Sequence, residues 1–183
     1  MARSGRETGR RERRPRRLFG FVRNRSGTAA VELAIVAAPF FALLIAILEV
    51  GLVFFAQQDL QTATTQAARL IMTGQAQNEN LTQGEFVQQV CNNAAIFTCG
   101  GLYANVQVYN SFQSVALSSP VSSGQFSSAG FQYNMGGPGD IVVVQVFYLW
   151  PVLGGPLNFN LANANGSYHL LVGTSAFRVE PYQ

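Results

Sequence analysis

Two carboxylates border a long apolar run, and their position gives them the clearest chemical meaning in this sequence. The uncharged core of the run, Leu33 to Leu48, lies between Glu32 and Glu49. It would form ~24 Å of helix, and a span of ~30 Å therefore places one or both glutamates at or inside the edge of a bilayer. A carboxylate there is costly, so by default it is functional and has a partner. The alternative for Glu32 is an interfacial residue that only faces headgroups. Glu49 either pairs with another chain or reaches the outer interface.

The remaining chemistry-bearing residues are two cysteines and one histidine. Cys91 and Cys99 are an even pair, which in an exported domain favours a disulfide worth ~2–3 kcal/mol. Two buried thiols are the alternative. A three-ligand metal site with His169 is a further alternative, but a lone histidine on a strand is more often structural. We therefore expect no metal and no cofactor.

Catalytic motifs are not found in this sequence. No serine lies in a nucleophile-elbow context, and His169 has no acidic partner near it in sequence. The glycines of residues 136–139 precede an expected strand, whereas a phosphate-binding loop precedes a helix. We expect a protein that is not an enzyme and has no small-molecule substrate.

The elements that position these residues begin with an arginine-rich leader. Ten of the twelve basic residues precede Ser26, whereas seven of the nine acids follow it. Such a block could bind nucleic acid, but directly before an apolar run it holds the N-terminus in the cytoplasm. We therefore expect a leader over residues 1–27, a transmembrane helix over 28–56, and no nucleic-acid partner. A removable signal peptide is the alternative, but the apolar run is long for one and carries two glutamates.

The apolar pattern becomes amphipathic after Ala56. Apolar residues recur at spacings of three and four, as in a helix that packs on a partner: Val53, Ala56, Leu60, Ala63, Ala67 and Leu70. Gly74 is a plausible stop for this helix. We expect residues 57–74 to continue the transmembrane helix to Thr73, and Val53, Leu60 and Ala67 to contact neighbouring helices. A span followed by a separate helix is the alternative.

The N-terminal region resembles the processing signature of type IV prepilins. The signature consists of a basic leader, Gly27, four small or apolar residues, Glu32 and then an apolar helix. The resemblance implies that a membrane prepilin peptidase cuts after Gly27 and makes Thr28 the new N-terminus. The Thr28 α-ammonium group would lie about one helical turn from Glu32, so Glu32 of one subunit could neutralise Thr28 of its neighbour.

The order of short motifs from about Gly27 to Tyr182 resembles TadE-like proteins of the tight-adherence (Flp) pilus system. These motifs are Ala30-Val31-Glu32, Glu49-Val50-Gly51, Gln66-Ala67-Ala68-Arg69 and the closing residues 176–181, AFRVEP. The resemblance implies a structural pseudopilin or minor pilin in the bacterial inner membrane. Its partners would be the peptidase, the assembly platform and other pilins or pseudopilins.

The outer part of the chain, residues 75–183, is long enough for one small core. Thr82 and Glu85 have the spacing of a capping box that opens a short helix. Alternating or continuous apolar residues predict strands over 103–112, 140–150 and 168–179, with a loop or weak hairpin over 114–137. The expected fold is α+β: a transmembrane helix that continues as an extended amphipathic helix, then a small pilin-like domain with an antiparallel sheet.

The leading functional hypothesis is a non-enzymatic subunit that helps assemble or prime a pilus, with its C-terminal domain in the periplasm, at the cell surface or in the pilus. The alternative is a permanent anchor that displays an extracytoplasmic binding or adhesin module. The two differ in the mature N-terminus and in the effect of Glu32→Ala, because only the pilin-like subunit needs that carboxylate for assembly.

Overall fold

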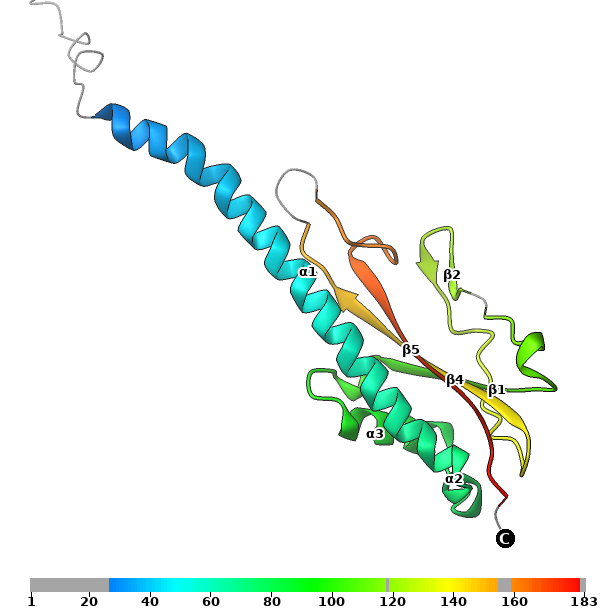
Figure 1. The fold of residues 1–183 in the computed structure, drawn as a ribbon. Coiled ribbons are helices and arrows are strands. Elements are labelled where there is room, and N and C mark those ends of the chain that lie inside the picture. The colour runs from blue at the N-terminus through cyan, green and yellow to red at the C-terminus, as the bar shows by residue number, and fades with distance from the viewer. Residues whose placement is uncertain (1–26, 118, 155–158, 182–183) are drawn as a thin grey trace, which may run out of the picture. The chain divides into compact units, whose positions relative to one another are not determined.

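The computed structural model describes residues 27–117, 119–154 and 159–181. The chain divides into two compact units, Met1–Phe40 and Phe41–Gln183. The described elements, in chain order, are α1 (Thr28–Met72), α2 (Gln75–Asn78), α3 (Gln83–Asn93), the 3-10 turn η3 (Cys99–Gly101), β1 (Leu102–Tyr109), the 3-10 turn η4 (Phe112–Ser114), β2 (Val121–Ser122), β3 (Gln125–Phe126), β4 (Ile141–Pro151) and β5 (Tyr168–Arg178). The first unit contributes the N-terminal turns of α1, and all other described elements belong to the second (Figure 1).

Helix α1 is continuous, as the sequence predicted. It contains Pro39 in its first half and no glycine or proline after Leu52. It ends because Gly74 adopts a left-handed conformation with φ 79°, which costs a glycine little. The free carbonyls of its last turn find partners: Gly74 donates its N–H to Ile71 at 3.2 Å, and Glu180 near the C-terminus donates to Met72 at 2.8 Å. The end of the chain thus caps the end of α1.

The main sheet is antiparallel with strand order β1-β4-β5. The register pairs Val106 with Val144 and Val146 with Gly173. Strand β4 is central and buried on both faces from Val142 to Phe147, which explains its near-continuous apolar sequence. Three predicted strands are confirmed with shifts of at most three residues at their ends, and the α+β class is confirmed.

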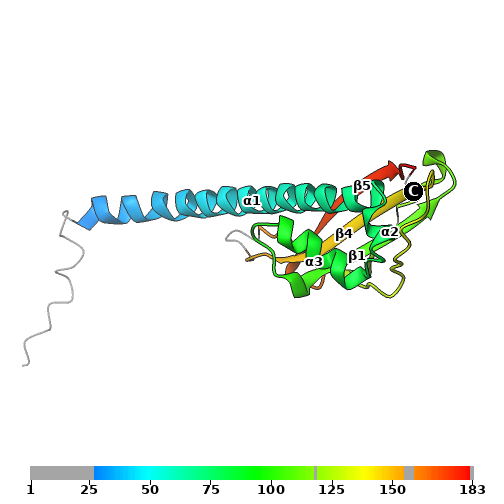
Figure 2. The same ribbon diagram turned by 90° about the horizontal axis from the view of Figure 1, so that it is seen from below.

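One face of the sheet carries the main core and is covered by helices (Figures 1 and 2). The second half of α1 and helix α3 pack there against β1, β4 and β5. The fully buried large side chains of this core are Leu60, Ile71, Phe86, Val90, Val106, Val142, Val144, Val146, Leu171 and Val179. Helix α3 begins with the predicted capping box, in which Thr82 and Glu85 bond each other's backbone N–H groups.

The other face of the sheet is covered by the segment that follows β1. Phe131 stacks on Phe147 with ring centroids 4.9 Å apart, and Phe126 lies edge-on to Phe131 at 6.0 Å. The predicted loop or weak hairpin over 114–137 contains one short hairpin, β2–β3. After it, Gln132 and Asn134 bond the backbone of Val106, so this segment also covers the free edge of β1.

Candidate functional site on helix α1

The N-terminal end of α1 holds the residues expected to be processed. Gly27 directly precedes the helix, Thr28 is its first residue, and Glu32 is exposed one turn later. Four residues of helix correspond to a rise of ~6 Å, so Glu32 lies within reach of an amine at the start of α1 or of a neighbouring helix. The arginine block lies outside the described residues. Cleavage after Gly27 stays a prediction.

The face of α1 that was expected to contact neighbouring helices lies in the core of the chain itself. Leu60 and Ala67 have no exposed surface and Val53 has only 8 %. The seven-residue spacing brings these side chains onto one side of the helix, and the chain's own sheet covers that side. These three side chains are therefore already covered within the chain, and their contact with neighbouring helices stays a prediction.

A glycine in β5 sets the distance between α1 and the sheet. A Cβ on Gly173 would lie 3.0 Å from the carbonyl oxygen of Leu60 and 2.9 Å from Cβ of Thr64, and would also overlap the Thr64 hydroxyl. The Thr64 hydroxyl is fully buried and has no hydrogen-bond partner among the described residues. The absence of a side chain at Gly173 thus permits a close approach that a larger residue would prevent.

Two glutamines of α1 pair with the free edge of β5. The side-chain amide of Gln57 donates to the carbonyl of Val172 at 2.8 Å and accepts from its N–H at 3.2 Å. Gln61 makes the same two bonds with Thr174, at 2.8 and 2.9 Å. Four residues of helix rise ~6 Å and two residues of strand rise ~6.8 Å, so the repeats match. The glutamines satisfy an edge that would otherwise be open to another strand.

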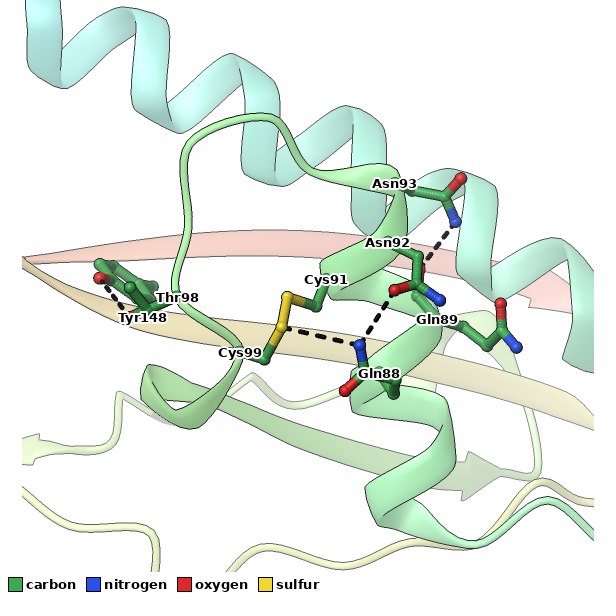
Figure 3. Close-up of a disulfide and its surroundings, with 8 residues drawn as sticks. All are labelled: Gln88, Gln89, Cys91, Asn92, Asn93, Thr98, Cys99 and Tyr148. Carbon is green, nitrogen blue, oxygen red and sulfur yellow. Dashed lines mark hydrogen bonds between the residues drawn. A yellow bond between two sulfur atoms is a disulfide. The ribbon is translucent and has the colours of Figure 1, made fainter.

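The loop between α3 and β1 is held from two sides. Asp59 of α1 accepts hydrogen bonds from the backbone N–H groups of Ala95 at 2.9 Å and Ile96 at 3.3 Å. The predicted disulfide Cys91–Cys99 is confirmed and joins α3 to the turn before β1 (Figure 3). These ties carry Phe97 into an aromatic cluster with Tyr148 at 4.7 Å and with Trp150 at 6.1 Å.

The exposed side of α1 changes character near Gln57. Before that point the exposed large side chains, apart from Glu32, are apolar: Val31, Leu33, Ile35, Val36, Phe40, Phe41, Leu43, Leu44, Ile45, Ile47, Leu48, Leu52, Phe54 and Phe55. After it, the exposed positions are Gln58, Thr62, Thr65, Gln66 and Arg69. Within the described part of the chain, α1 is the helix that is long and apolar enough to cross a membrane.

Glu49 has a partner within the chain. Its carboxylate accepts a hydrogen bond of 2.8 Å from the backbone N–H of Leu153, which follows β4. The sequence alone leaves open whether Glu49 pairs with another chain or reaches the outer interface. The structure shows a third arrangement, in which the acid holds the end of β4 against α1.

The alternative of a metal site is contradicted, because Cys91 and Cys99 are bonded to each other and offer no thiolate. Among the described residues, no group of three or more His, Cys, Asp or Glu side chains could hold a metal ion. His169 has a structural contact instead: its Nδ1 lies 2.6 Å from the carbonyl oxygen of Leu161.

Two ionisable groups near α3 have shifted pKa values. Hydrogen bonds from the backbone and hydroxyl of Thr82 lower the pKa of Glu85. Burial, with a smaller contribution from the Glu85 charge, raises the pKa of Tyr133 to about 12. Both groups belong to the packing of α3, since the Tyr133 ring lies 6.0 Å from Phe86.

Several residues of this site were not identified from the sequence. The amphipathic pattern places Gln57, Asp59 and Gln61 between its apolar positions and gives them no partner by itself. A signal was present, because two glutamines four residues apart next to a buried Leu60 can match a strand edge. The position of Gly173, in the middle of a predicted strand, was a second signal of close approach.

Comparison with known protein families gives a match in the part of the chain that contains α1. The family model described as TadE-like protein matches residues 27–69. No curated protein and no solved structure matches the chain. The match runs from Gly27, the expected processing residue, through most of α1. Over residues 27–69 the chain is therefore similar to the TadE-like family.

Proposed function

We propose that this protein is a pseudopilin or minor pilin of a tight-adherence pilus, anchored in the inner membrane by α1 and cut after Gly27. The observation that carries the proposal is the TadE-like match over residues 27–69, which coincides with a continuous helix whose exposed side is apolar as far as Phe55. The family is a structural one, which supports a non-enzymatic role. The peptidase, assembly platform and other pilins are the proposed partners.

Contacts with other subunits are proposed on the first half of α1, whose large apolar side chains are exposed, because the side of Val53, Leu60 and Ala67 in its second half is covered by the chain's own sheet. Small residues recur at every fourth position of the first half of the helix, in a row that winds from its exposed side toward the side of Val53: Ala30, Ala34, Ala38, Ala42 and Ala46. In a membrane, such spacing lets two helices approach closely, and packing contacts then replace the hydrophobic effect as the source of association. Glu32 lies among these alanines and would supply the charged end of the contact.

The test is complementation of a strain in which the native gene has been deleted. The wild-type chain should restore pili seen by electron microscopy, whereas Glu32→Ala should not, because the amine of a neighbouring subunit would lack its counter-charge. Glu79→Ala is the matched control, since Glu79 is an exposed glutamate outside α1. Full piliation with Glu32→Ala would contradict the proposal and favour a permanent anchor that displays a binding module.

A further inference from the structure

The end of β4 lies beside the part of α1 that is expected to leave the bilayer. The apolar exposed side of α1 ends at Phe55, and polar residues follow from Gln57. At ~1.5 Å per residue, Leu52 lies ~5 Å and Ile45 ~15 Å from Phe55 along the helix axis. In a hydrocarbon region of ~30 Å this range covers the outer half, with Leu52 nearest the outer edge.

A groove opens between α1 and the end of β4 at this level. Its volume is about 250 Å³, and it is lined by Ile45, Leu48, Glu49, Leu52, Trp150, Pro151 and Leu153. Leu153 is 80 % exposed, the highest exposure among the exposed large apolar side chains described. Six of the seven lining residues are apolar or aromatic, so water is a poor occupant for the groove.

The one charged group of the groove is bonded to the backbone that would enter lipid. Glu49 accepts from the N–H of Leu153 at 2.8 Å. A non-helical N–H group near the hydrocarbon region needs a partner, and so does a carboxylate. The Leu153 N–H group and the Glu49 carboxylate are each other's hydrogen-bond partners. The end of β4 and the glutamate can therefore enter the outer part of the bilayer together.

We propose that residues Trp150–Leu153 form a second membrane contact, in which this segment inserts into the outer interfacial region and a lipid acyl chain occupies the groove beside α1. Trp150, the only tryptophan of the chain, would have the position at the interface that tryptophan favours in membrane proteins. Such a contact fixes the orientation of the C-terminal domain relative to the bilayer. It depends on α1 spanning the bilayer and not on a role in a pilus.

The native tryptophan allows a direct test with the full chain in vesicles. Lipids brominated near the headgroup end of the acyl chain quench a tryptophan that they contact, so most of the Trp150 emission should be lost. The matched control is Trp150→Phe/Phe112→Trp, which moves the tryptophan to an exposed position after β1, near the strand ends that pair Tyr109 with Ile141. The control should keep most of its emission.

Equal quenching of the native chain and the control would overturn the proposal. So would quenching that is weak and falls further with protein density, because a second copy of the chain would then cover the groove. Flotation of each variant with the vesicles after an alkaline wash shows that the chain is anchored as an integral membrane protein, so a failure to quench in that fraction contradicts the second contact and leaves the anchor intact.

A substitution at the exposed tip gives an independent measurement. Leu153→Asp should reduce the quenching of Trp150, because a carboxylate resists insertion. The side chain is 80 % exposed, and thermal unfolding of the variant checks that the new charge beside Glu49 leaves the domain folded. Leu117→Asp, at an exposed leucine beside the residue that Tyr109 contacts, is the control and should leave quenching unchanged. Unchanged quenching with Leu153→Asp would overturn insertion of the segment.

Discussion

Replacing Gly173 by alanine should separate α1 from the sheet and destabilise the domain. The new Cβ would lie 3.0 Å from a backbone oxygen of Leu60 and 2.9 Å from Cβ of Thr64, whereas ordinary contacts of this kind begin near ~3.5 Å. The helix would have to retreat by roughly half an ångström. That retreat would also stretch the bonds of Gln57 and Gln61 to β5. Overpacking of this size costs ~1–3 kcal/mol.

The assay is thermal or urea unfolding of the full chain in detergent, followed by the fluorescence of Trp150. Gly84→Ala is the control, because nothing lies within 4 Å of its Cβ position in helix α3 and the change should be neutral or stabilising. Adding Thr64→Ala to Gly173→Ala should recover only part of the loss, since Cβ of residue 64 and the Leu60 oxygen remain. Stability of Gly173→Ala equal to or above that of the wild type would refute the close contact.

Three further outcomes are expected in the C-terminal domain. Gln61→Ala should lower the free energy of unfolding by about 1–2 kcal/mol and speed amide hydrogen exchange at Thr174. Gln66→Ala, at an exposed position of the same helix, should do neither. Equal effects of the two substitutions would argue against the pairing of Gln61 with the edge of β5. Reduction of the disulfide should lower the free energy of unfolding by ~2–3 kcal/mol, and unchanged stability would contradict this. The pKa of Tyr133 is raised to about 12 in the folded state, so the free energy of unfolding should fall as the pH rises from about 10 to about 12. Glu85→Gln should lower the pKa of Tyr133, because it removes a nearby negative charge. The pKa of Tyr133 is measured by subtracting the phenolate absorbance of Tyr133→Phe from that of the wild type at each pH.

The sequence was most informative where one local pattern decides the structure. The capping box of Thr82 and Glu85, the apolar run of β4 and the absence of helix breakers after Leu52 each act within a few residues, and each was confirmed. The disulfide followed from an even pair of cysteines and is also confirmed.

What covers the side of α1 that carries Val53, Leu60 and Ala67 could not be predicted from a local pattern. A seven-residue spacing of Val53, Leu60 and Ala67 shows that one side of the helix is covered, but another subunit and the chain's own sheet give the same pattern. The choice depends on contacts with β5, more than a hundred residues away. The bond between Glu49 and Leu153 was missed for the same reason, since it joins residues separated by 104 positions.

The mass of the native protein, isolated from envelope membranes without reduction, is the most direct test of the role proposed for α1. The expected result is a chain that begins at Thr28, with Cys91 and Cys99 joined. That result would place the amine of the mature chain one turn from Glu32, where packing between subunits requires it. A chain that begins at Met1 or Ala2 in the same membranes would contradict processing at Gly27 and, with it, the proposal of a pilin-like subunit.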